Sequence, residues 1–375
     1  MKTGMTLEAL LAEVQRQSRA KQDFVASTEE AIRMVPMPGF PREVALVLLG
    51  ADDQALRRFR ISDHCHHQIA GRLQIPWKYY DRLLTDHRDL VMDQVNALFE
   101  REPARRLLRT MDGIARGFLS DRYLRIDNDA ILTNTLPPII RGDIETKLLS
   151  SHVSDQGGMS LKLLMTDDSL AVDLGRTARG DAQDIVRPGF RMSNDEVGRG
   201  KTKIEGFFYR SYCLNGCVFG TESTFDFSRT HLGGKILDGI DYEVLSDETR
   251  RLEDQTIVAQ IRDVMTAIGD KAFHVKLGER LLATKQSEHI AKPTDAIRFL
   301  AKEVNLTDSE TDQALTNLLT DADLTQWGAV NAVTKIANSD ETTYERANEL
   351  ESIGAKILAL NPASWNRIAE YVEAA

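Results

Sequence analysis

The order of the secondary-structure signals constrains the fold of this chain more than any other feature. Between residues 105 and 217, short apolar and aromatic runs are separated by Asp-Gly, Ser-Asp and Gly-Gly, which are turn signals of antiparallel strands. After about Leu245 the periodicity becomes helical, with Ile257, Ile261 and Val264 on one helix face. Runs of strands followed by runs of helices predict an α+β fold, with an antiparallel sheet in the central part, flanking helices and a mostly helical C-terminal region.

Three segments of different character divide the chain. The first, residues 1–60, is expected to hold an amphipathic helix that starts near Leu7, followed by an extended connector rich in proline. The second, residues 61–245, is expected to form the α+β core, which begins with two short helices, the first capped by Ser62. The third, residues 246–375, is expected to be a helical C-terminal region.

Charge is distributed unevenly along the sequence. The chain carries 47 Lys and Arg residues against 57 Asp and Glu residues, a net charge of −10. Residues 101–235 contain 20 cations and 18 anions, whereas residues 236–375 contain 14 cations and 25 anions. A polyanion site is therefore expected in the middle third, and the acidic C-terminal region would oppose indiscriminate binding of nucleic acid.

The sequence contains no signal for membrane insertion or export. No apolar run approaches the roughly 20 residues of a membrane-spanning helix, and the first residues lack the apolar core of a secretory signal. Three cysteines are too few for a disulfide framework and suit a reducing compartment. We therefore expect a cytoplasmic protein without a membrane partner.

A turn followed by an aromatic strand carries the first candidate binding residues. Met192–Gly200 is expected to form the turn, which Asn194, Glu196 and Gly198 would shape. The cations expected to face a ligand on this hairpin are Arg199, Lys201, Lys203 and Arg210, and aromatic residues lie on the same hairpin at Phe207–Tyr209. Lys and Arg bind phosphate and aromatic rings stack on unpaired bases, so the hairpin indicates a single-stranded nucleic acid.

A second basic cluster lies on a neighbouring predicted hairpin. Its candidate binding residues are Arg116, Arg122, Tyr123 and Arg125. Residues 101–126 hold seven cations against three anions, so two basic hairpins in one sheet would form a groove for a polynucleotide. The alternative is that these arginines form ordinary surface ion pairs with nearby aspartates, and that the aromatic residues lie in the core.

Signals for catalysis or metal binding are missing from the sequence. It has no P-loop, dinucleotide-binding glycine motif, G-x-S-x-G or H-E-x-x-H. His64–His67 groups three histidines with one cysteine, but adjacent helix positions do not share a face and further ligands are lacking nearby. We therefore expect no cofactor and no metal, and the sequence gives no positive support for an enzyme.

Three short motifs occur in order along the chain: GFLSDRY at Gly117–Tyr123, SNDEVG at Ser193–Gly198 and CLNG at Cys213–Gly216. Together with Trp327–Thr334 and a helix around Glu351, they resemble the phage- and plasmid-borne domain-of-unknown-function family 932 over residues 60–360. Asp195 and Leu214 replace the Ser and Thr usual in that family. The resemblance implies a mobile-element protein that acts inside a bacterial cell, without a settled activity.

Three functions are carried forward from the sequence. The first is binding of single-stranded DNA, with strand annealing or recombination as its use, because a basic aromatic sheet followed by a long helix resembles phage annealing proteins in outline. The second is a protein-interaction module that acts on a host defence or replication factor through the acidic helical half. The third is a metal-dependent nuclease or nucleotide-processing enzyme. A homo-oligomer is compatible with each.

Overall fold

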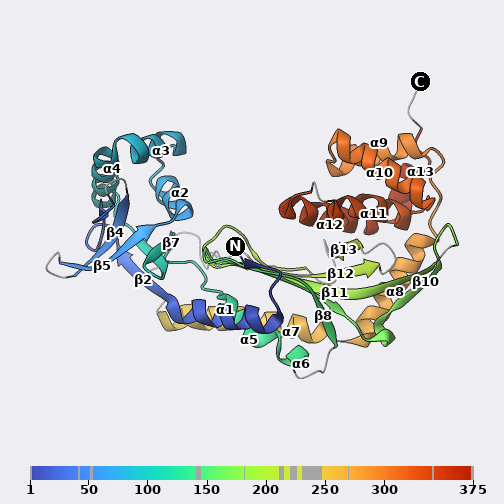
Figure 1. Cartoon of the computed structure of the whole chain (residues 1–375), viewed down its shortest axis with the longest axis horizontal. Helices are drawn as coiled ribbons and strands as arrows, with labels where there is room; N and C mark the ends of the chain where they lie inside the picture. The colour runs from blue at the N-terminus through green and yellow to red at the C-terminus, as the bar shows by residue number, and fades with distance from the viewer. Residues whose placement is uncertain are drawn as a thin grey trace.

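Two β-sheets organise the chain, and helices pack on both of them (Figure 1). The computed structural model describes residues 2–40, 43–50, 54–140, 145–180, 182–210, 215–219, 226–229, 247–268, 270–339 and 342–372. Helices dominate the chain from residue 247 on. The predicted α+β class, with an antiparallel sheet and a mostly helical C-terminal region, is therefore confirmed.

The N-terminal sheet contains the strands β2 (Lys21–Ser27), β3 (Ile32–Pro36), β4 (Val44–Leu49), β5 (Ala55–Ile61), β6 (Arg105–Met111) and β7 (Ile114–Ser120). Their order is β2-β6-β7-β5-β4-β3, and every described pair except β5 with β7 is antiparallel. The helices α2 (Asp63–Arg72), α3 (Trp77–Asp86) and α4 (Arg88–Arg101) share a core with this sheet. Phe59, Leu108 and Phe118 are the strand residues at the centre of that core.

The central sheet contains the strands β1 (Lys2–Thr3), β8 (Thr146–Val153), β9 (Gly158–Met165), β10 (Val172–Arg176), β11 (Gln183–Asp195), β12 (Thr202–Arg210), β13 (Asn215–Phe219) and β14 (Asp226–Arg229). The described order is β1-β8-β9-β11-β12-β13, with β10 paired to β11 and β14 to β12. Three helices, α1 (Leu7–Ala20), α5 (Asn128–Thr135) and α7 (Asp247–Ile268), lie below it in Figure 1. Their apolar faces bury Leu161, Phe190 and Ile204 of the sheet.

The C-terminal helices form a third core. They are α8 (Lys271–Lys285), α9 (Pro293–Val304), α10 (Asp308–Asp321), α11 (Gln326–Thr334), α12 (Tyr344–Leu358) and α13 (Pro362–Ala369). Trp327 and Trp365 are fully buried at their centre. Buried ion pairs also join α12 to the central sheet, since Glu351 lies 2.5 Å from Lys162 of β9 and 3.5 Å from Arg191 of β11. No helix within the described ranges is both long and apolar enough to cross a bilayer.

The first 60 residues differ from the prediction. The amphipathic helix is present as α1, but β2 to β5 occupy most of the stretch in which an extended connector was expected. These strands belong to the same sheet as β6 and β7, so the sheet crosses the predicted boundary at residue 60. Strands β2 and β5 carry many polar side chains, including Asp23, Arg57 and Arg58, and their pairing with neighbouring strands decides their structure.

A pair of glycine variants tests the packing of the C-terminal helices. A Cβ atom at Gly328 in α11 would lie 1.7 Å from the Asp323 carbonyl oxygen, whereas a Cβ at Gly71 in α2 would have no neighbour within 4 Å. We expect Gly328→Ala to lower the free energy of unfolding by about 3 kcal/mol. Gly71→Ala should raise it by about 0.5 kcal/mol, because alanine favours a helix. Urea unfolding followed by circular dichroism measures both, and equal effects would contradict the packing described.

Candidate functional site

A buried carboxylate, Glu196, lies where the two sheets meet. It directly follows β11, and its side chain is only 1% exposed. Lys21 Nζ, at the start of β2, lies 2.7 Å from Glu196 Oε1. Arg116 of β7 lies 3.3 Å from Oε2, and the backbone N–H of Asn128 donates to Oε1 at 2.9 Å. One side chain thus joins two strands of the N-terminal sheet and the start of α5 to the end of β11.

Arg109 of β6 extends this arrangement. Its guanidinium donates to the Glu196 carbonyl oxygen at 2.8 Å and forms ion pairs with Asp127 at 2.5 Å and Asp23 at 3.0 Å. Burial alone would lower the pKa of Arg109, but the surrounding carboxylates, Asp127 first, raise it above its usual range. We call Lys21, Arg109, Arg116, Glu196, Asp127 and Asp23 the Glu196 hub. Its cations are neutralised by carboxylates of the protein itself.

The three predicted turn residues make contacts that hold the chain after β11. Asn194 donates to the Ile126 carbonyl oxygen at 2.9 Å and accepts a hydrogen bond from the Thr202 hydroxyl at 2.6 Å. Gly198 has a φ of +86°, which favours glycine, and a Cβ atom there would lie 3.2 Å from Leu119. With Glu196 in the hub, all three positions act on the path of the backbone. The predicted turn begins later than expected, because β11 continues to Asp195.

The predicted cations of the aromatic hairpin lie in three different environments. Arg210 is buried and forms ion pairs with Asp184 at 2.6 Å, and Arg199 lies 2.8 Å from Asp195. Lys203 is 41% exposed and lies 3.7 Å from Glu205, whereas Lys201 is exposed. Of these four residues, only the two lysines are therefore placed to meet a ligand without first breaking a close ion pair.

The second predicted cluster is also divided between interior and surface. Arg116 is 1% exposed in the hub, and Tyr123 is buried with its hydroxyl donating to the Asp195 carbonyl oxygen at 3.2 Å. Burial raises the pKa of the Tyr123 hydroxyl. Arg125 is half-buried and Arg122 is exposed. The predicted residues consequently do not form one continuous basic face, and the alternative of ion pairs within the protein accounts for Arg116 and Arg210.

The aromatic residues proposed for base stacking lie mostly in the interior. Phe207 and Phe208 are each 1% exposed, and Tyr209 is half-buried. Lys162 Nζ lies 4.9 Å from the centre of the Phe207 ring, so this ring already has a cation on its face. Half of the CLNG motif, Cys213 and Leu214, lies outside the described residues.

Two arginines, one near the start of β6 and one at the end of α2, have no ion-pair partner among the described residues. Arg106 is half-buried on β6, and Arg72 is the exposed last residue of α2. Neither makes a hydrogen bond or an ion pair with any residue that the structure describes. Burial lowers the pKa of Arg106, and the nearby charge of Arg72 lowers it further, against the opposite effect of Asp121. The like charge of Arg72 and the opposite charge of Asp121 thus both act on Arg106.

Arg122 belongs to the same end of the sheet. Its backbone N–H donates to the Ser120 hydroxyl at 3.2 Å, and Ser120 is the β7 residue paired with Arg106. We call Arg72, Arg106 and Arg122 the arginine edge. The sequence indicated Arg106 only as one cation of the basic segment 101–126 and gave no signal for Arg72. Arg72 comes near β6 and β7 only because α2 packs on β7.

The histidine-rich segment of α2 forms contacts within the protein. His64 Nε2 lies 3.0 Å from the Val197 carbonyl oxygen, and His66 Nδ1 lies 2.8 Å from the Tyr80 hydroxyl. Burial lowers the pKa of His66 to about 4, so its ring is neutral near pH 7. In the ranges that the structure covers, no three His, Cys, Asp or Glu side chains are grouped as a metal site would require.

Comparison with known proteins found no similar family, protein or structure. No protein-family model, curated protein or solved structure matches this chain. The resemblance to the phage- and plasmid-borne family therefore stays a prediction, and the function has to be argued from the site itself.

Replacement of Glu196 tests the hub. Glu196→Gln would leave Arg116 buried without its carboxylate and would remove the 2.7 Å ion pair of Lys21, which keeps only Asp127 at 3.7 Å and Asp129 at 3.6 Å among the described residues. Breaking a buried pair in this way costs about 3–5 kcal/mol. Asp168→Asn is the matched control, because Asp168 is 89% exposed in its ion pair with Arg187 and should change the stability by less than about 1 kcal/mol. Urea unfolding compares the two variants. A Glu196→Gln protein as stable as the wild type would show that the hub is not needed for the fold.

Asp184 predicts how acid weakens the protein. Burial alone would raise its pKa, but Arg210 and Lys285 outweigh burial and hold the pKa below the ordinary value of 3.8. These ion pairs therefore contribute stability above about pH 4, and the contribution is lost as the pH falls through the lower folded-state pKa. We expect Asp184→Asn to be less stable than wild type at neutral pH and to lose less on acidification. Thermal unfolding across a pH series measures this, and parallel curves would contradict it.

Proposed function

We propose that this protein binds single-stranded nucleic acid, and that the arginine edge contacts the phosphates. The observation that carries the proposal is the pair Arg72 and Arg106, two neighbouring guanidinium groups without a partner in the described part of the chain. Arg122 adds a third positive charge at the same end of the sheet. This site replaces the hairpin residues Arg116 and Arg210, whose guanidinium groups are occupied by Glu196 and Asp184.

Electrostatics favours an anionic ligand at this position. Elsewhere the chain gives its buried arginines carboxylate partners, as it does for Arg109, Arg116 and Arg191. Arg106 is half-buried and forms no such ion pair in the described part of the chain, and the nearby charge of Arg72 disfavours its charged form, against the opposite effect of Asp121. A phosphate accepts several N–H bonds from guanidinium groups and would offset this repulsion. A polynucleotide supplies such phosphates at regular intervals.

The neighbouring helix offers groups that suit a single strand. α3 begins five residues after Arg72, and its first turn presents Lys78 and an exposed aromatic ring, Tyr79. Unpaired bases stack on exposed aromatic rings, whereas the bases of a duplex are already stacked on each other. Lys201 and Lys203 form a separate exposed position, and strand annealing would be one use of such binding.

A double variant of the arginine edge tests this function. Arg72→Ala with Arg106→Ala should weaken the binding of a fluorescein-labelled oligothymidylate and reduce the slope of log affinity against log salt by about 0.7 for each lost phosphate contact. The measurement is fluorescence anisotropy over a series of salt concentrations. Far-UV circular dichroism checks that the variant remains folded.

Two further variants separate the possible explanations. Arg298→Ala with Arg367→Ala removes two exposed arginines from the C-terminal helices, so it controls for net charge and should leave the salt slope unchanged. Lys201→Ala with Lys203→Ala tests the site predicted from the sequence. An unchanged affinity and slope for the arginine-edge variant, or an equal loss in the Arg298/Arg367 control, would overturn the proposed site.

A further inference from the structure

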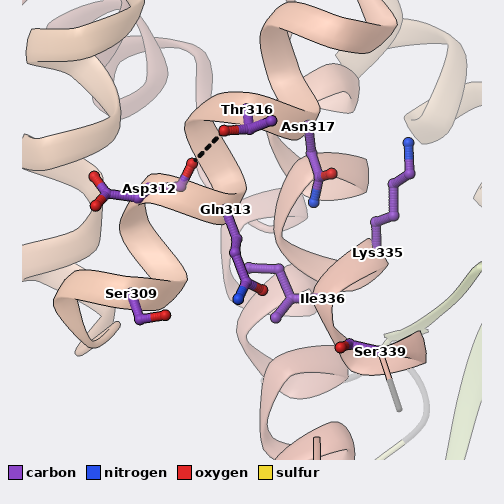
Figure 2. A pocket seen from close by; sticks show the side chains of 8 residues that line it. All are labelled: Ser309, Asp312, Gln313, Thr316, Asn317, Lys335, Ile336 and Ser339. Atoms are coloured by element: carbon purple, nitrogen blue, oxygen red, sulfur yellow. Dashed lines mark hydrogen bonds between the residues drawn. The ribbon is translucent and has the colours of Figure 1, made fainter. Parts of the chain in front are cut away.

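A polar pocket of about 620 Å³ lies in the C-terminal helices, between α10 and the helical turn Lys335–Asn338. Figure 2 shows Gln313, Asn317 and Ile336 between Asp312 on one side and Lys335 on the other. The pocket belongs to a different part of the chain from the arginine edge. Its lining mixes hydroxyl, amide and charged groups with one apolar side chain, so its hydrogen-bonding groups decide what it can bind.

Some of the polar groups that line this pocket already bond within the protein. Asn317 Nδ2 donates to the Ala332 carbonyl oxygen at 3.0 Å, and the Thr316 hydroxyl donates to the Asp312 carbonyl oxygen at 2.8 Å (Figure 2). Lys335 Nζ lies 3.1 Å from Asp321 Oδ1, so its positive charge is compensated. The described lining therefore presents no uncompensated positive charge to an anion.

Acceptors, in contrast, remain open. The Asp312 carboxylate is exposed and has no hydrogen bond or ion pair with the described residues. Asn317 Oδ1 accepts no hydrogen bond from any described residue, and the amide is oriented by its bond to the Ala332 carbonyl oxygen. The side-chain amide of Gln313 is also without a partner in the described part of the chain. With Lys335 compensated by Asp321, the described lining of the pocket presents one negative charge, at Asp312.

We propose that this pocket binds an arginine or lysine side chain carried by a peptide segment of a protein partner. Guanidinium and ammonium groups carry only donors, which matches the open acceptors at Asp312 and Asn317. Ile336 is the one apolar residue of the described lining, and the aliphatic part of a long basic side chain would lie toward it. Residues 236–375 carry 25 anions against 14 cations, so the surrounding charge attracts a basic segment.

A peptide titration tests this site separately from nucleic-acid binding. The probe is a fluorescein-labelled glycine peptide with two arginines, and the control peptide carries citrulline, the uncharged analogue of arginine, at both positions. We expect Asp312→Asn to weaken binding of the arginine peptide about tenfold, because a charge-assisted hydrogen bond is lost. Glu303→Gln removes an exposed carboxylate from α9, outside the pocket, and should change the affinity less than twofold.

The outcomes separate a built site from general attraction. The proposal is supported if Asp312→Asn binds the arginine peptide more weakly than wild type while Glu303→Gln binds it as wild type does. In addition, the wild-type protein should bind the citrulline peptide at least tenfold more weakly than the arginine peptide. Equal loss in the Asp312 and Glu303 variants would show that overall acidity attracts the peptide, and equal affinity of the two peptides would show that charge is not recognised. Either result overturns the site. The oligothymidylate affinity of Asp312→Asn should equal that of the wild type.

Discussion

A buried carboxylate is stable only if hydrogen-bond donors and cations of the protein replace the water around it. The fold depends on how this chain satisfies that condition at Glu196. Its two side-chain oxygens are satisfied by Lys21, Arg116 and the backbone of Asn128, while Arg109 binds its carbonyl oxygen. These groups come from β2, β7, α5 and β6, which are far apart in the sequence. The hub is therefore the point at which the N-terminal sheet is fixed to the central sheet. A second buried ionic contact, at Glu351, fixes α12 to β9 and β11 of the central sheet.

The hub also decides which arginines of this chain are available to bind a ligand. A basic segment indicates a binding surface only if its charges are available, and Arg116 and Arg210 are occupied by buried carboxylates. Arg72 and Arg106 are the informative pair, because they lie close together and have no such partner among the described residues. The same reasoning, applied to acceptors in place of donors, assigns a basic ligand to the pocket at Asp312. Both proposals follow from which polar groups the fold leaves unsatisfied.

Local signals predicted much of the fold. Ser62 caps α2 as expected, and β6, β7 and α7 lie where the short apolar runs and the helical periodicity of the sequence indicated. Strands β2 and β5 were not predicted, because they are rich in polar side chains that do not alternate with apolar ones. Pairing with neighbouring strands decides their structure. The site was harder to predict, since the partner of Arg116 lies 80 residues away at Glu196. Sequence alone cannot show which charges such distant contacts will neutralise.

Arginine-specific modification with a dicarbonyl reagent, followed by peptide mass spectrometry, tests the central claim most directly. The claim is that arginines without an internal ion pair bind the ligand, whereas arginines paired with buried carboxylates stabilise the fold. The account predicts that Arg72 and Arg106 react in the free protein and are protected by oligothymidylate. Arg116 and Arg210 should remain unreactive in both samples, because they are buried with their carboxylates. Modification of Arg72 and Arg106 that is indifferent to the oligonucleotide, or ready modification of Arg116 in the folded protein, would contradict the account.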